Sequence, residues 1–124
     1  MQVEVSGEVL AGLVGRYFLG AEIPAVESWR SPLEEMHARM LTGNLETKGY
    51  WTDLYRARRD TAAVLNTGMA DDLERVIGEL SSSEEENLAL IMFQGSGFGY
   101  MTWVSQDFSF VVSCIRVSDK RIRK

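Results

Sequence analysis

The stretch of sequence that indicates the fold most clearly is residues 87–117, NLALIMFQGSGFGYMTWVSQDFSFVVSCIRV. It contains three apolar runs that are rich in β-branched and aromatic residues, at Leu88–Phe93, Tyr100–Val104 and Phe108–Val117. Runs of this kind, separated by short breaks, are typical of β-strands. The first is apolar at every position, which favours a central strand covered on both faces. We therefore expect an antiparallel meander of three strands at this end of the chain.

The residues before this stretch have helical periodicity. Ser6 can cap a helix that ends at Gly20, and Ser31-Pro32-Leu33-Glu34 has the pattern of a capping box for a second helix, which stops at Gly43. A third helix is expected after Thr52. A fourth is expected over 70–80, with four apolar residues on its buried side: Leu73, Val76, Ile77 and Leu80.

Together these patterns predict one α+β domain over residues 1–124, with a basic tail at 116–124. It has about four helices followed by a C-terminal three-stranded antiparallel meander, with the helices packed mainly on one face of the sheet. Residues 44–52 fit neither period well, and a further strand could lie there.

The charge is unevenly distributed along the chain. Residues 1–115 carry 17 acidic and 8 basic residues, a net of −9, whereas the tail carries five basic residues and one acidic residue. Between Met69 and Glu86 there are seven acids and one base, Arg75. Such a body repels nucleic acid and anionic membranes. It suits a partner protein with a basic surface, and it equally suits ordinary solubility.

The sequence also bears on the compartment. The single cysteine, Cys114, excludes an intrachain disulfide and is compatible with a reducing environment. The first residues have no basic segment of the secretory kind, and no apolar stretch reaches membrane-spanning length. We therefore expect a soluble, cytoplasmic protein.

No motif for catalysis, a metal or a cofactor stands up to its context. The glycines of GSGFG, residues 95–99, lie between two strands rather than between a strand and a helix, which favours a hairpin turn over a phosphate-binding loop. Glu34 and His37 have metal-ligand spacing, but the chain has no second histidine. A pairing of His37 with Cys114 is disfavoured because the alternation from Phe108 places Cys114 on a buried face. We expect no cofactor, no metal and no catalytic residue.

Six residues are candidates for contact with a partner. Four are acids of the predicted fourth helix, and two are aromatic residues in the weakly patterned segment: Asp71, Asp72, Glu74, Glu79, Tyr50 and Trp51. Tyrosine and tryptophan beside arginine are typical of interface hot spots. Trp51 has a second interpretation, in which it closes the core.

Two classes of function follow from these patterns. The first is a small acidic, non-enzymatic protein-binding module of the inhibitor, immunity or chaperone/adaptor type, which covers a basic surface of a partner. The alternative is a small-ligand-binding domain or minor enzyme with an apolar pocket between helices and sheet, lined by methionines: Met36, Met40, Met92 and Met101. A homodimer through an edge strand, Phe108–Val117, is compatible with either.

Overall fold

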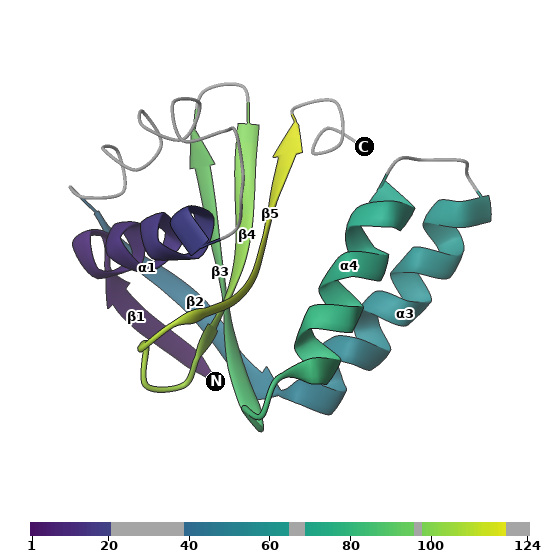
Figure 1. Ribbon diagram of the computed structural model, residues 1–124, viewed down its shortest axis with the longest axis horizontal. Helices are drawn as coiled ribbons and strands as arrows, with labels where there is room; N and C mark the ends of the chain where they lie inside the picture. The colour runs from purple at the N-terminus through teal and green to yellow at the C-terminus, as the bar shows by residue number, and fades with distance from the viewer. Residues whose placement is uncertain (21–38, 65–68, 96–97, 119–124) are drawn as a thin grey trace.

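The computed structural model describes residues 1–20, 39–64, 69–95 and 98–118. These residues form a five-stranded antiparallel sheet with strand order β1-β2-β3-β4-β5, together with three helices (Figure 1). The elements in chain order are β1 (Gln2–Ser6), α1 (Gly7–Gly20), β2 (Met40–Thr47), α3 (Lys48–Val64), α4 (Met69–Ser82), β3 (Asn87–Gly95), β4 (Phe98–Ser105) and β5 (Val111–Ser118).

The architecture predicted from the sequence was wrong. Instead of four helices followed by a three-stranded meander, two strands from the first part of the chain, β1 and β2, join β3, β4 and β5 in one sheet. The predicted helix from Ser31 to Gly43 falls largely outside the described residues, but its last part, from Met40 onward, is strand β2. The physical reason is pairing: β2 lies between β1 and β3 and forms hydrogen-bonded ladders with both.

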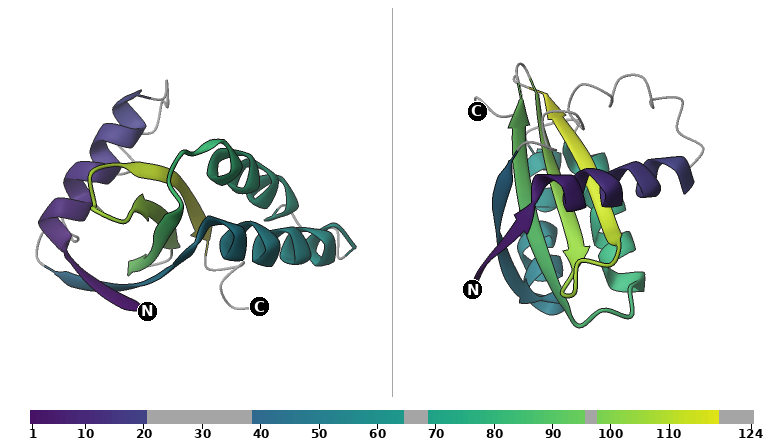
Figure 2. Two further views of the ribbon diagram at one scale, coloured as in Figure 1. Left: turned by 90° about the horizontal axis from the view of Figure 1, so that it is seen from below. Right: turned by 90° about the vertical axis from the view of Figure 1, so that its left-hand side faces the viewer.

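Helices cover both faces of the sheet rather than mainly one. Figure 2 shows the sheet between α1 on one side and the α3–α4 pair on the other. Side chains alternate between the two sides along β3, so that Ala89 and Ile91 pack with α1 whereas Leu88 and Leu90 pack with α3 and α4. Strand β3 is therefore the doubly covered central strand that its apolar sequence predicts.

The cluster between the sheet and α3–α4 is built around three aromatic rings. Trp51 stacks on Tyr55 with ring centroids 6.0 Å apart, and Tyr55 meets Trp103 edge to face at 5.3 Å. The indole nitrogen of Trp51 donates a 2.8 Å hydrogen bond to the carbonyl of Leu88. This arrangement satisfies the polar edge of a buried tryptophan and fixes α3 against β3.

The close packing of β2 against β3 depends on a glycine. Gly43 pairs with Ile91, and a Cβ atom at position 43 would lie 2.6 Å from the carbonyl oxygen of Leu90. A glycine inside a strand commonly marks such a close approach.

Helices α1 and α4 agree with the sequence predictions, whereas the N-terminal cap of α3 differs from the predicted one. The amide of Glu8 donates to Ser6 Oγ, so Ser6 caps α1 as predicted. Helix α4 extends slightly beyond its predicted bounds and buries the four apolar residues expected of it. Helix α3, however, begins before Thr52, and the amide of Tyr50 donates to Thr47 Oγ1, which makes Thr47 the cap.

Strand β5 begins later than the sequence suggests and contains a β-bulge. The register passes from Trp103↔Ser113 to Val104↔Val111, so Val112 is an extra residue. The alternation expected from Phe108 to Cys114 is therefore wrong, because an extra residue reverses the facing of everything after it. Cys114 is nevertheless buried, on the α1 side.

Candidate functional site

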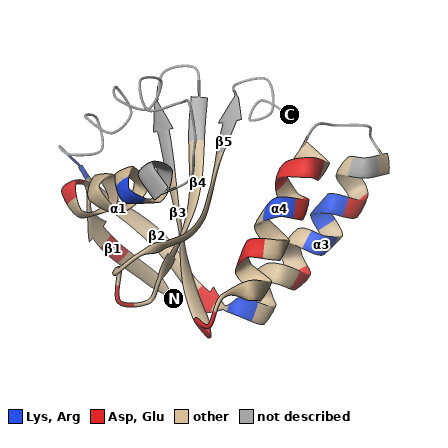
Figure 3. Ribbon diagram, viewed as in Figure 1, with Lys and Arg blue, Asp and Glu red and all other residues tan. Residues whose placement is uncertain are grey.

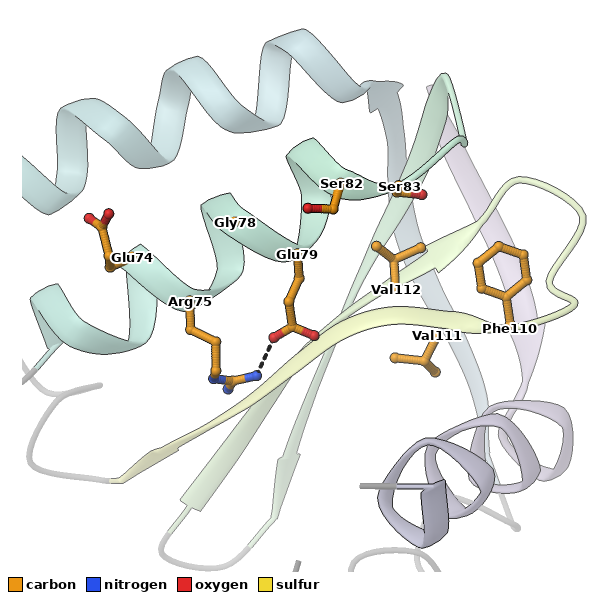
Figure 4. Close-up of a pocket in the computed structure, with 9 residues that line it drawn as sticks. All are labelled: Glu74, Arg75, Gly78, Glu79, Ser82, Ser83, Phe110, Val111 and Val112. Atoms are coloured by element: carbon orange, nitrogen blue, oxygen red, sulfur yellow. Dashed lines mark hydrogen bonds and ion pairs between the residues drawn. The ribbon is translucent and has the colours of Figure 1, made fainter. Parts of the chain in front are cut away.

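An open groove runs between helix α4 and strand β5, and we call it the α4–β5 groove. It encloses about 630 Å³ and is lined by Glu74, Arg75, Gly78, Glu79, Ser82, Ser83, Phe110, Val111 and Val112 (Figure 4). Because β5 is the last strand of the sheet, the groove lies along a sheet edge and is not an enclosed cavity. One wall is helical and mostly polar, and the other is apolar.

The apolar wall ends at Phe110, which the turn between β4 and β5 holds in place. Ser105 Oγ donates to Asp107 Oδ1 at 2.9 Å, and Ser109 Oγ donates to the same oxygen at 2.7 Å. The amide of Phe110 donates in turn to Ser105 Oγ. Phe108 takes a φ of 57° within this turn, a left-handed conformation that is uncommon outside glycine. The result is a phenyl ring at Phe110 that is 45% exposed beside the groove.

The helical wall contains a glycine, Gly78, which has no side chain. Nothing lies within 4 Å of where a Cβ atom of Gly78 would be, so the surface of α4 is bare at this point. Beyond it lie the hydroxyl groups of Ser82 and Ser83, and before it lies Glu74. The carboxylate of Glu74 accepts a 2.9 Å hydrogen bond from Arg59 of α3, a pair exposed to solvent and thus worth little stability.

Three side chains meet around the outer edge of β5 and form what we call the edge clasp: Tyr17, Arg75 and Glu79. Arg75 Nη1 lies 2.6 Å from Glu79 Oε1, and the Tyr17 hydroxyl donates to Glu79 Oε2 at 2.9 Å. Arg75 Nη1 also donates to the Tyr17 hydroxyl, and Arg75 Nη2 donates to the backbone carbonyl of Cys114 at 2.9 Å. Ser113 Oγ adds a 3.3 Å hydrogen bond to Glu79.

The environment changes the acidity of two groups in this region. Burial, reinforced by the hydrogen bond to Glu79, raises the pKa of Tyr17 to about 12. In the turn that carries Phe110, hydrogen bonds from Ser109 and Ser105 lower the pKa of Asp107. Near neutral pH, Tyr17 is therefore a hydrogen-bond donor and Asp107 an acceptor.

The four predicted acidic contact residues lie on one helix, but they do different things. Glu74 and Glu79 line the α4–β5 groove. Asp71 and Asp72 lie in the first turn of α4 and do not line the groove. Figure 3 shows charged positions of both signs along the neighbouring helices α3 and α4 and few on the sheet. Glu79 is committed to the edge clasp.

The two predicted aromatic contacts separate. Tyr50 is exposed at the start of α3, whereas Trp51 is buried in the cluster with Tyr55 and Trp103. Of the two interpretations of Trp51, the structure places it in the core. Neither residue lines the groove.

The remaining candidates for chemistry can also be located. Cys114 is a free, buried thiol, and burial raises its pKa to about 12. His37 and Glu34 lie outside the described residues. Within the described residues, no group of three or more His, Cys, Asp or Glu side chains is arranged to hold a metal ion, and no helix is long and apolar enough to cross a membrane.

Two of the four methionines expected to line a pocket are exposed, and the described residues of GSGFG lie at a hairpin. Met40 and Met92 are exposed, Met101 is half-buried against the α3–α4 cluster, and Met36 lies outside the described residues. In the GSGFG segment, Gly95 pairs with Phe98, so two residues connect antiparallel β3 and β4. This pairing agrees with the hairpin interpretation.

Sequence reasoning did not find the partners of Glu79. Tyr17 is 62 residues away in the chain, and Arg75 was noted only as the single base in an acidic segment. Their helical periodicity places both on structured elements, but no local signal brings them to the same edge of a sheet. Comparisons with models of protein families, with curated proteins and with solved structures found no match.

Proposed function

We propose that this chain is a non-enzymatic protein-binding module, of the inhibitor, immunity or chaperone/adaptor type, that holds a basic, extended segment of a partner protein in the α4–β5 groove. The observation that supports this most is the placement of an exposed phenylalanine next to an acidic helix along one edge of the sheet. A basic partner with apolar side chains complements both walls.

Affinity in such a groove comes mainly from its apolar wall. Phe110 is 45% exposed and is held by a hydrogen-bonded turn, so little conformational entropy is lost when a partner covers it. Val112 lies beside it and points toward α4 (Figure 4). Aromatic anchors in a well-packed setting carry much of the binding energy of protein interfaces.

Helix α4 supplies the preference for positive charge. Over Met69–Ser82 it carries four acids and one base, a net of −3. These acids are Asp71, Asp72, Glu74 and Glu79, the four named from the sequence. Of these, Glu74 and Glu79 line the groove, and Glu79 is paired with Arg75. Charges at the rim of an interface act chiefly by raising the association rate, and salt screens them. Binding should therefore weaken as ionic strength rises.

The groove favours an extended segment over a helix in the partner. Beside Val111 and Val112, before the contacts of the edge clasp at Ser113 and Cys114, the outer edge of β5 pairs with no further strand of the described sheet. Extended peptides commonly bind to such edges, with alternate side chains entering pockets. An extended segment with both apolar and basic side chains can place the apolar ones against Phe110 and Val112 and the basic ones beside α4.

Three synthetic peptides of about ten residues, roughly 33 Å when extended, test the proposal directly. One alternates valine and arginine, one alternates valine and glutamate, and one alternates serine and arginine. We expect the first to bind most tightly in fluorescence anisotropy and to lose affinity in high salt. Equal binding of the glutamate peptide, or binding independent of salt, would contradict the proposal.

A matched pair of charge reversals locates the contact. Glu74→Lys removes an exposed ion pair at the groove, and Asp53→Lys removes one on α3, where Asp53 contacts Arg56. We expect Glu74→Lys to weaken the valine–arginine peptide by about tenfold, or about 1.4 kcal/mol. Asp53→Lys should change it little. Equal losses would show a general charge effect instead of a site.

We place this function in the cytoplasm as part of the same proposal. Cys114 supports it, because a free thiol in the core suits a reducing compartment.

A further inference from the structure

Strand β5 is an edge that would ordinarily invite pairing. It is eight residues long, lies at the end of the sheet and contains no proline. A strand edge presents unpaired N–H and C=O groups, which form a template for a strand from another molecule. Natural proteins usually protect such edges with charges, bulges or covering elements.

The β-bulge decides which backbone groups face outward. The amide of Ser105 donates to the carbonyl of Phe110, so Phe110 directs its carbonyl toward β4. Without the bulge, Cys114 would also direct its carbonyl toward β4, because the backbone groups of every second residue in a strand point to the same edge. The extra residue at Val112 reverses this, and Cys114 and Arg116 direct their backbone groups to the outer edge.

The edge clasp covers one of these outward groups. Arg75 Nη2 donates to the Cys114 carbonyl at 2.9 Å. Glu79 holds the guanidinium through the 2.6 Å ion pair, and the Tyr17 hydroxyl holds Glu79 from the other side. Because α1 and α4 lie on opposite faces of the sheet, the clasp closes around the edge from both faces. A pairing strand would need the space about 4.8 Å from β5 that these side chains fill.

We propose that the edge clasp prevents β5 from pairing with the β5 strand of a second copy of this chain, and that opening the clasp converts this edge into a self-association surface. A second copy fits the edge because two identical strands can pair antiparallel about a twofold axis. The segment Val111–Ile115 carries no charge that would oppose such pairing. The clasp is then the device that stops it.

Arg75→Ala tests the proposal with the protein alone. This variant should form a dimer whose population rises with concentration in analytical ultracentrifugation, across roughly a hundred-fold range. The wild-type chain should stay monomeric over the same range. Arg58→Ala is the control, since Arg58 is an exposed arginine of α3 away from the edge, and it should also stay monomeric. A wild-type dimer through β5, or a folded Arg75→Ala variant that remains monomeric, would overturn the proposal.

Two further variants make the outcome specific. Arg75→Ala combined with Arg116→Pro removes an outward N–H group from the opened edge and should restore the monomer, because an edge proline blocks strand pairing. A dimer that persists in this variant uses another surface and contradicts the proposal. Glu79→Gln keeps the size of the side chain, weakens the hold on Arg75 and should give a weaker dimer. If circular dichroism shows that Arg75→Ala is poorly folded, Glu79→Gln provides the same test.

Discussion

The hydroxyl of Tyr17 donates a 2.9 Å hydrogen bond to Oε2 of Glu79 and accepts one from Arg75 Nη1, and these contacts join two helices that lie on opposite faces of the sheet. Helices on opposite faces ordinarily communicate only through the sheet between them. Here they touch directly around its edge, next to the α4–β5 groove. Two residues of the edge clasp, Arg75 and Glu79, therefore also line the groove.

Removing the Tyr17 hydroxyl should have a small, measurable cost. Tyr17→Phe deletes two hydrogen bonds, the one donated to Glu79 and the one accepted from Arg75. We expect the free energy of unfolding to fall by about 1–2 kcal/mol. Tyr50→Phe is the matched control, because Tyr50 is exposed, and it should change stability by less than about 0.5 kcal/mol. Urea denaturation of both variants measures the difference. Equal losses of stability in the two variants would indicate that the hydroxyl of Tyr17 contributes no more to stability than the hydroxyl of an exposed tyrosine.

Stability should decrease in alkaline solution. The pKa values of Tyr17 and Tyr55 are raised from 10.0 to about 12, mainly by burial. Their contribution is fully present below pH 10, where both states are protonated. It is lost as the pH rises toward 12, because the unfolded chain releases the proton and the folded chain retains it. Urea denaturation at a series of pH values measures the slope, which Tyr17→Phe should make shallower. An unchanged slope in that variant would show that Tyr17 titrates normally.

Gly43 should tolerate no side chain. An alanine Cβ would approach the Leu90 carbonyl oxygen at 2.6 Å and the Ile91 side chain at 2.8 Å, and relief of such overpacking typically costs about 1–3 kcal/mol. At Gly15 of α1, nothing lies within 4 Å of the place that a Cβ atom would take, so Gly15→Ala should instead stabilise by up to about 1 kcal/mol through helix propensity. Thermal unfolding of the two variants should therefore shift in opposite directions.

Cys114 should react slowly with thiol reagents in the native protein. The thiolate is the reactive form, and burial raises the pKa of this thiol to about 12. Thr102 Oγ1 lies 3.4 Å from its sulfur in the same buried setting. Alkylation by iodoacetamide at neutral pH, followed by mass spectrometry, should proceed only on unfolding in urea. Fast native alkylation would contradict the burial of this strand residue.

Local sequence patterns predicted the helices and strands whose apolar spacing is clear within a single segment of the chain. Helix α4 follows from its apolar spacing, and β3 follows from an uninterrupted apolar run. Strand β1 has an alternation of Val3 and Val5 with polar residues that a strand prediction could have used, but it is only five residues long. Strand β2 contains Gly43 and has a weak alternation. Its structure depends on ladders to β1 and β3, which are contacts between distant parts of the chain.

The residues of the candidate site also divide into those that the sequence could identify and those that it could not. Glu74 and Glu79 could be named because an acidic helix face is visible in the sequence. Phe110 could not be identified as exposed, because FSFVV reads as one continuous strand until the bulge at Val112 is known. The turn that directs Phe110 outward depends on hydrogen bonds among Ser105, Asp107 and Ser109, whose side chains give no strong sequence signal of this geometry.

Gly78 lies in the wall of the α4–β5 groove and allows a test of whether this groove binds a basic, extended segment. Gly78→Gln adds a neutral side chain where nothing lies within 4 Å, so it should fill the groove and leave the fold intact, since glutamine favours helix over glycine. We predict that the valine–arginine peptide loses at least about tenfold in affinity for this variant, measured by fluorescence anisotropy. Unchanged affinity in a stably folded Gly78→Gln variant would contradict the claim, because the peptide would then bind elsewhere.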